Sequence, residues 1–180
     1  LLAKHRIFRG CKKAVVNRDD VMTIPLVSPE VEVVSWCMAE PELHGYGLRQ
    51  KGGVEYLCHG SQTLLPVAEL SLSGRHNVAN ALAALALGHS AGLPLAGMKA
   101  ALRNFKGLPH RCELVAEIDG VRYVNDSKGT NIGAAEAALR GLGGERNILL
   151  IAGGQGKGAD FSQLQQAVVR HCKLLILMGE

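Results

Sequence analysis

The stretch NILLIAGGQGKGADFSQLQQAVVRHCKLLILM, residues 147–178, decides the fold class of the chain. It contains an apolar strand over residues 147–152, a glycine-rich loop, a helix from Asp160 to about His171, and a second strand over residues 174–178. A strand, a loop, a helix and a strand in this order predict a parallel βαβ unit. We therefore expect an α/β fold.

Outward from this unit, apolar periodicity and turn residues predict further elements. An Asp-Gly pair at positions 119 and 120 favours a hairpin between the strands on either side. The predicted strands cover residues 13–17, 31–36, 113–118 and 121–125, a small meander at a sheet edge covers residues 44–72, and the predicted helices cover residues 1–9, 76–90, 94–105 and 131–142.

The residues Lys106-Gly107-Leu108-Pro109 separate a helical hairpin from the βα series that follows. Glycine and proline interrupt regular structure, and the order of elements restarts after them. We therefore place a domain boundary here, between residues 1–107 and residues 108–180. A hinge between two domains would act at this joint.

Composition argues against several classes of protein. The chain has 180 residues, 47% hydrophobic and 20% charged, with a formal net charge of +4, which is the profile of a globular protein. It has neither a dense run of Lys and Arg nor aromatic residues interleaved with them, so we expect no nucleic acid partner. The longest apolar stretch, residues 78–88, is too short to span a bilayer, so we expect no membrane partner.

The five cysteines and seven histidines show neither disulfide nor zinc-ligand spacing. The expected compartment is therefore the reducing cytoplasm. Without a heptad pattern or a long apolar stripe, the expected state is a monomer. The chain does not begin with Met and opens inside a predicted helix, so we interpret it as an internal segment of a longer protein.

The glycine-rich loop at residues 151–161 is the first candidate site. Backbone amides between a buried strand and a helix can bind an anion, and Lys157 adds a positive charge. The loop is not a Walker A motif, because Gly158 follows the lysine where a Ser or Thr would bind magnesium. The alternative is a tight turn with a solvated lysine, and we expect Asp160 to cap the helix.

The second candidate site lies at residues 123–132, where a predicted strand ends and mainly polar residues lead into a helix. Ligands of open α/β sheets bind at the carboxyl ends of strands. Asp126 can hold a metal or orient a cation, Lys128 can bind phosphate, and Thr130 carries a hydroxyl. The alternative is turn chemistry, with Thr130 or Asn131 capping the next helix.

The segment GLPHR, residues 107–111, follows the predicted domain joint. The planar guanidinium of Arg111 can form two parallel hydrogen bonds with a phosphate, which a lysine cannot do. The imidazole of His110 either contacts a nucleotide or packs within the loop.

The segment SGRHNVAN, residues 73–80, begins a predicted helix. Asn77 and Asn80 are three positions apart and share one helix face, where two amides can read a purine edge. The alternative is that Ser73 or Asn77 caps the helix.

Together, the four segments resemble the Mur ligase family in order and spacing, over nearly the whole chain. The segment NDSK-x-TN, residues 125–131, is the most specific and resembles the family members that add D-glutamate. GLPHR, SG-x-HN-xx-N and GG-x-GK-x-ADF complete the set. One departure is Gly129, where the family usually has Ala, and it removes no functional group.

The resemblance implies an ATP-dependent ligase that adds D-glutamate to UDP-N-acetylmuramoyl-L-alanine in peptidoglycan precursor synthesis, through an acyl phosphate. It implies the C-terminal part of a central ATP-binding domain, followed by the first half of a Rossmann-like, amino-acid-binding domain. Such a segment is expected to have no ligase activity alone. The implied roles are adenine contacts by Asn77 and Asn80, nucleotide contacts by His110, Arg111, Asp126 and Lys128, charge neutralisation in catalysis by Arg111 and Lys128, and D-glutamate binding by Thr130 and Lys157.

Lys4 is similar to the lysine that becomes carbamylated in this family, three residues before the pair Ile7-Phe8. The resemblance implies that Lys4, as a carbamate, presents two oxygens to Mg²⁺, a cation that prefers oxygen ligands. Without the resemblance, Lys4 is an ordinary helix lysine.

Three other interpretations stay open. The first is another Mur ligase or a folylpolyglutamate synthetase-like ligase, against which residues 125–131 favour D-glutamate as the amino acid added. The second is a nucleotide-binding module without catalysis, which an unmodified Lys4 would favour. The third is an α/β domain whose glycines only make turns.

Overall fold

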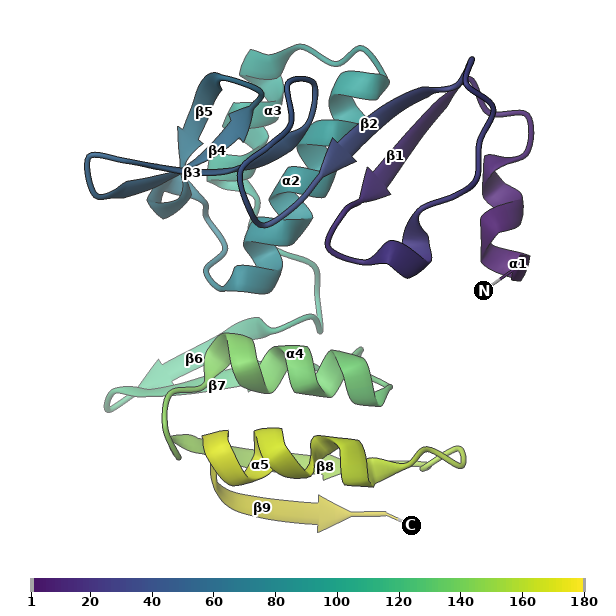
Figure 1. Cartoon of the computed structure of the whole chain (residues 1–180). Coiled ribbons are helices and arrows are strands. Elements are labelled where there is room, and N and C mark those ends of the chain that lie inside the picture. Colours follow the sequence, from purple (N-terminus) through teal and green to yellow (C-terminus); the bar gives the residue numbers. More distant parts are fainter. Residues whose placement is uncertain (1, 180) are drawn as a thin grey trace. The chain divides into compact units, whose positions relative to one another are not determined.

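The structure is a computed structural model that describes residues 2–179. It divides into two compact units, Leu1–Phe105 and Lys106–Glu180, which are each described by themselves. Both units combine helices with strands (Figure 1), which confirms the α/β fold class. No helix within residues 2–179 has the length and hydropathy needed to cross a bilayer.

The first unit contains a five-stranded sheet in the order β1-β2-β3-β4-β5. β1 and β2 pair in parallel along their length, and β2 continues in parallel to β3 at Trp36 and Tyr46. β3, β4 and β5 then pair antiparallel, which confirms the expected meander at the sheet edge. The strand bounds are β1 Lys13–Asn17, β2 Glu32–Trp36, β3 Tyr46–Lys51, β4 Val54–His59 and β5 Gln62–Pro66.

The helices of the first unit follow the predicted positions within one or two residues, except at the N-terminus. There, the predicted single helix is a short α-helix followed by a 3₁₀ turn, and Gly10 with φ 69° follows both. α2 is the long helix that lies beside the sheet in Figure 1. The bounds are α1 Leu2–His5, α2 Arg75–Ser90 and α3 Leu95–Asn104, with 3₁₀ helices at Arg6–Phe8, Val21–Thr23 and Val67–Glu69.

The core of the first unit forms between α2 and the sheet. Leu57 on β4, Leu65 on β5 and Leu82 on α2 are fully buried and belong to one apolar cluster. Burial of each such side chain contributes roughly 1.5–3 kcal/mol. This cluster therefore fixes which face of α2 meets the sheet.

The second unit begins with a hairpin of β6 (Glu113–Ile118) and β7 (Val121–Asn125). Its turn residues Asp119 and Gly120 have φ angles of 50° and 76°. Positive φ at both central residues is the type I′ geometry that Asp-Gly favours. The hairpin is therefore found at the predicted place.

The helix α4 (Ile132–Leu142) leads to β8 (Ile148–Gly153), and β8 pairs in parallel with β9 (Cys172–Met178). This confirms the parallel βαβ unit. The helix predicted from residue 160 differs, because Phe161–Leu164 is a 3₁₀ turn and α5 covers only Gln165–His171. β9 also begins two residues earlier than predicted, since the backbone is already extended at Cys172.

The core of the second unit is small. Leu139 on α4, Ala167 on α5 and Cys172 on β9 form its buried cluster. On β8 the exposed positions alternate with half-buried ones, and Leu149 and Ile151 are each about 60% exposed. One face of the β8–β9 sheet therefore carries exposed apolar side chains.

Candidate functional site

Two loops of the second unit meet at the candidate site: residues 107–112 and residues 126–131. The backbone N–H of Lys128 donates to the carbonyl of His110 at 3.1 Å. The backbone N–H of Cys112 donates to Oδ1 of Asp126 at 3.0 Å. These bonds bring together the predicted site residues of the two segments, which are His110, Arg111, Asp126 and Lys128.

The backbone of the first loop is held in an unusual conformation. His110 and Cys112 have positive φ angles of 63° and 46°, a region that non-glycine residues rarely adopt. The N–H of His110 donates to Oε2 of Glu113 at 2.8 Å, and the N–H of Arg111 donates to the carbonyl of Leu108 at 3.2 Å. With the Cys112 bond, the backbone N–H groups of residues 110–112 are all occupied, so these three residues can contact an anion only through their side chains.

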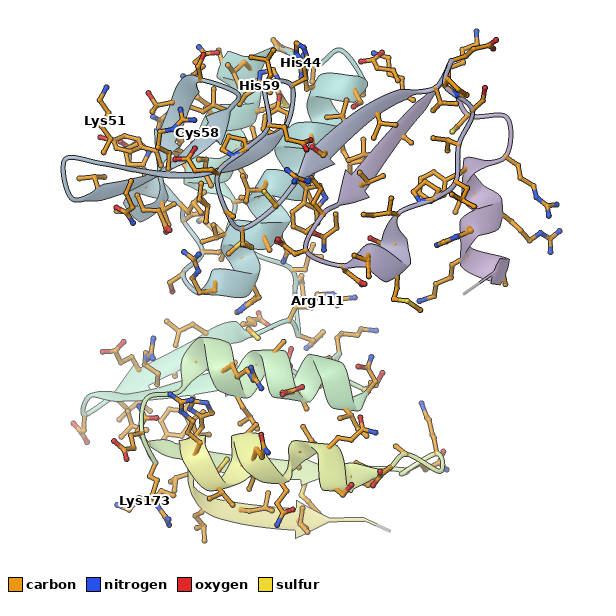
Figure 2. All side chains as sticks on the ribbon, viewed as in Figure 1. His44, Lys51, Cys58, His59, Arg111 and Lys173 are labelled. Atoms are coloured by element: carbon orange, nitrogen blue, oxygen red, sulfur yellow. The ribbon has the colours of Figure 1, made fainter. Side chains whose placement is uncertain are left out.

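Two cationic side chains of the site are exposed. Arg111, labelled in Figure 2, and Lys128 form no ion pair and no side-chain hydrogen bond with any residue in the part of the chain that the structure describes. An Arg guanidinium and a Lys ammonium without internal partners are groups that can bind phosphate oxygens.

Asp126 joins the two loops through its carboxylate. Burial, followed by the neighbouring negative charge of Asp126 and its hydrogen bond, raises the pKa of the Cys112 thiol to about 11. A Cβ at Gly129 would collide with Oδ2 of Asp126. The absence of a side chain at Gly129 therefore provides the space that the Asp126 carboxylate occupies.

The start of α4 shows which of Thr130 and Asn131 caps the helix. Oδ1 of Asn131 accepts a hydrogen bond from the N–H of Ala134 at 2.9 Å, so Asn131 is the N-cap. The Thr130 side chain is exposed, and its hydroxyl has no partner among residues 2–179. It is therefore available to a ligand.

The glycine-rich loop begins at the carboxyl end of β8. Lys157 has a positive φ of 49° and an exposed side chain. The N–H of Gly154 donates to Met178 and that of Ala159 to Gly156. Oδ1 of Asp160 accepts a hydrogen bond from the backbone N–H of Ser162 at 3.1 Å, which confirms Asp160 as an N-cap. Hydrogen bonds from the side chain and from the backbone of Ser162 lower the pKa of the Asp160 carboxyl.

In the first unit, Asn77 and Asn80 share one face of α2 as predicted. Nδ2 of Asn77 donates to the carbonyl of Ser73 at 2.9 Å, and Nδ2 of Asn80 reaches Oδ1 of Asn77 at 3.5 Å. The helix has its N-cap at Gly74 without a side-chain bond. Capping by Ser73 or Asn77, the alternative drawn from the sequence, is therefore not what these side chains do.

Lys4 lies on α1 with an exposed side chain. Within residues 2–179, no group of three or more His, Cys, Asp or Glu side chains gathers around a point that could hold a metal. A carbamate on Lys4 offers two oxygens, whereas Mg²⁺ is octahedral. The described residues therefore do not form a complete magnesium site by themselves.

Sequence reasoning missed two residues of the site. Asn125 was identified as the end of a strand and the first residue of the segment 125–131, without a role of its own, yet its amide contacts both Ser127 and Nδ1 of His110. Cys112 was only counted among the cysteines, yet it contacts Asp126. The position of Asn125, directly before a polar loop at the carboxyl end of a strand, was the one signal for it.

The fold and these side chains define an α/β protein with exposed cationic groups in the loops that follow its strands. Residues 1–88 match the family model described as Mur ligase middle domain, and residues 110–180 match the one described as Mur ligase, glutamate ligase domain. The chain belongs to the Mur ligase family.

Relatives are similar along the whole chain. The UDP-N-acetylmuramoylalanine–D-glutamate ligase of Pseudomonas syringae pv. syringae is 52% identical over 180 residues, and that of Pseudomonas fluorescens strain Pf-5 is 53% identical. Each alignment covers 99% of this chain and 40% of the relative. The chain therefore spans about 40% of the length of these curated relatives.

Solved structures of more distant proteins share the fold. MurF from Acinetobacter baumannii aligns with a TM-score of 0.67 at 20% identity, covering 99% of this chain and 42% of that one. The UDP-N-acetylmuramate-alanine ligase MurC from Thermotoga maritima aligns with a TM-score of 0.61 at 18% identity, covering 98% of this chain and 40% of that one.

Proposed function

We propose that this chain is part of an ATP-dependent ligase that joins D-glutamate to UDP-N-acetylmuramoyl-L-alanine. The names of relatives that are 52% and 53% identical support it. The observation that carries the proposal is the pair of joined loops, in which the side chains of Arg111 and Lys128 are exposed and have no partner among residues 2–179. Such charges suit a reaction that moves a phosphoryl group.

The proposed reaction has two steps. The terminal carboxylate of UDP-N-acetylmuramoyl-L-alanine attacks the γ-phosphate of ATP, which forms an acyl phosphate and releases ADP as the leaving group. The amine of D-glutamate then attacks the acyl carbon, and phosphate leaves. Arg111 and Lys128 neutralise the negative charge that shifts among the phosphate oxygens, and the loops hold them in position.

The other residues bind the substrates. Thr130 and Lys157 bind the D-glutamate carboxylates, with a hydroxyl that has no partner among residues 2–179 and an exposed ammonium. The following residues contact ATP: Asn77, Asn80, His110 and Asp126. Magnesium would screen charge on the phosphates, and Lys4, as a carbamate, would contribute oxygens to a site that needs further ligands from outside the described residues.

We further propose that the ligase works as a cytoplasmic monomer, without a nucleic acid or membrane partner. The same proposal includes the substrates ATP, D-glutamate and UDP-N-acetylmuramoyl-L-alanine. It also includes a hinge between the two domains at residues 106–108. We expect that the 180-residue chain alone shows no ligase turnover, and turnover by it would contradict this.

The test is phosphate release by the full-length ligase with ATP, magnesium and UDP-N-acetylmuramoyl-L-alanine. Release is expected with D-glutamate and not with L-glutamate or L-lysine. Replacing Lys128 with Ala is expected to lower kcat by about 100-fold or more, the scale of losing one charge stabiliser. Lys173→Ala is the matched control, because Lys173 is an exposed lysine on β9 of the same unit (Figure 2), outside the two loops.

The other outcomes separate the alternatives. Release with a different amino acid would keep a ligase and reject D-glutamate as its substrate. No release with any acceptor would favour a nucleotide-binding module without catalysis. An equal loss in Lys128→Ala and Lys173→Ala would reject the special role of the loop.

A further inference from the structure

Asn125, the last residue of β7, lies between two polar neighbours. Its Oδ1 accepts a hydrogen bond from the backbone N–H of Ser127 at 3.1 Å. Its Nδ2 lies 2.9 Å from Nδ1 of the His110 ring. The two ends of one amide therefore bind the two loops of the candidate site.

The amide of Asn125 can take only one of its two orientations. A backbone N–H is always a donor, so the amide atom that faces Ser127 must be the oxygen. The reversed orientation would place an NH₂ group against the Ser127 N–H and leave both without an acceptor. The NH₂ group consequently faces the imidazole.

This orientation decides where the proton of the neutral His110 ring lies. An NH₂ group donates, so Nδ1 must accept, and the proton is on Nε2. Oε2 of Glu113 is 3.9 Å from Nδ1, but it already accepts from the His110 backbone N–H at 2.8 Å. The backbone N–H of Lys128 donates to the His110 carbonyl at 3.1 Å, so the backbone N–H and C=O of His110 are both held.

We propose that Asn125 is a positioning residue that holds His110 in the Nε2–H tautomer, so that Nε2 donates to a phosphate oxygen of ATP. The His110 side chain is 53% exposed, and its Nε2 has no partner among the residues that the structure describes. The identity of the phosphate as that of ATP rests on the proposed function, and the tautomer does not.

The first test is nitrogen NMR of the histidine rings in the 180-residue chain, with ¹⁵N-labelled imidazoles. At a pH well above the ordinary histidine pKa of about 6.5, the ¹⁵N shifts report which nitrogen carries the proton. The wild-type His110 ring is expected to be protonated on Nε2. An Nδ1–H tautomer in the wild type would overturn the proposal.

Asn125→Asp is the informative variant, because it keeps the shape and still accepts from the Ser127 N–H. Its second oxygen faces Nδ1 and can only accept, so the ring is expected to change to the Nδ1–H tautomer. Asn147→Asp is the matched control, since Asn147 also accepts from a backbone N–H, that of Gly144 at 2.8 Å, away from His110. An unchanged His110 tautomer in Asn125→Asp would overturn the proposal.

The second test measures steady-state kinetics of the full-length ligase. Losing the Nε2 donor in Asn125→Asp is expected to raise the KM for ATP by about tenfold, the scale of one hydrogen bond, with the KM for D-glutamate unchanged. Asn147→Asp should leave both constants unchanged. A tautomer that changes without any rise in the KM for ATP would overturn the phosphate contact.

The two tests distinguish failure of the proposed function from failure of the proposed role of Asn125. If the tautomer changes as expected but the full-length protein releases no phosphate with any acceptor, the proposed function is wrong and the role of Asn125 in setting the tautomer stands. If the ligase is active but the tautomer does not change, only the role of Asn125 is wrong.

Discussion

The thiol of Cys112 lies beside the carboxylate of Asp126, at the point where the two loops of the candidate site meet. Burial, the negative charge of Asp126 and its hydrogen bond raise the pKa of this thiol to about 11. The thiolate is the reactive form of cysteine. We therefore expect Cys112 to react slowly with alkylating reagents at neutral pH.

Replacing Asp126 with Asn should lower the pKa of Cys112, because the negative charge disappears while burial stays. Alkylation rates across pH, followed by mass spectrometry of the peptide that contains Cys112, would measure the change. Cys172 is an internal control, since burial alone raises the pKa of its thiol. Equal Cys112 rates in both proteins at every pH would contradict the assigned cause.

Gly129→Ala tests the contact between Asp126 and Cys112 by displacing the Asp126 carboxylate instead of removing its charge. An added Cβ would collide with Oδ2 of Asp126, and the far end of a side chain can move away at small cost. Because Gly129 does not have a positive φ, Ala adds no backbone strain there. We expect the carboxylate to shift and the pKa of Cys112 to fall, as measured by the same alkylation profile.

Of single residues, the sequence could predict caps and turn residues but not the contacts between loops. Asp160 was predicted as a cap correctly, because its partner Ser162 is two residues away. The pair of Asn125 and His110 is separated by 15 positions and depends on the positive φ of His110. Neither the separation nor that conformation has a local sequence signal.

At the scale of elements, α4 depends on its N-cap. Oδ1 of Asn131 satisfies the N–H of Ala134, so Asn131→Ala should destabilise the second unit by about 1 kcal/mol. Asn131→Asp keeps an acceptor and should cost much less. Urea unfolding followed by hydrogen exchange of α4 would measure both, and equal losses in the two variants would show that the cap is not the cause.

The contact between β4 and α2 should make the first unit sensitive to acid. The His59 ring stacks on Tyr46 with centroids 4.6 Å apart, and its centroid is 5.0 Å from that of His89. Burial lowers the pKa of His59 and the charge of His89 lowers it further, while a hydrogen bond with the backbone of His44 raises it. The folded chain thus binds this proton more weakly than the unfolded chain.

Stability contributed by neutral His59 is therefore complete above about pH 6.5 and is lost as the pH falls through the lowered pKa. The urea midpoint of the first unit should fall across this range in the wild type and less steeply in His59→Gln. His5→Gln, which changes a histidine on α1, is the control. Identical slopes in wild type and His59→Gln would reject His59 as the cause.

Most strands and helices could be predicted because their signals are local. The Asp119-Gly120 turn needs positive φ at both positions, and both residues tolerate it, so the hairpin was placed correctly. The region after residue 160 was wrong, because one turn of sequence cannot distinguish a period of 3.0 from one of 3.6. Residues 161–164 consequently form a 3₁₀ turn.

At the scale of the whole chain, the two units have separate cores. The cluster around Leu82 contains residues of the first unit only, and the cluster around Leu139 contains residues of the second only. Leu82→Ala should destabilise the first unit by about 2–5 kcal/mol. Native-state hydrogen exchange should then show lower protection in α2 and unchanged protection in α4.

Leu87→Ala is the matched control, because Leu87 lies on the same helix and is 57% exposed. We expect its effect to stay within about 0.5 kcal/mol. An equal loss of protection in α4 and α2 after Leu82→Ala would mean that the two units unfold together.

Separate cores also have a consequence for genetic recombination. A crossover between residues 105 and 106 would divide neither apolar cluster, because each is contributed by one side of that point. Two Mur ligase genes could therefore exchange their downstream halves there without forming a mismatched interior in either half. A crossover inside α2 would instead combine half of one core with half of another, and mismatched packing would destabilise those chimaeras.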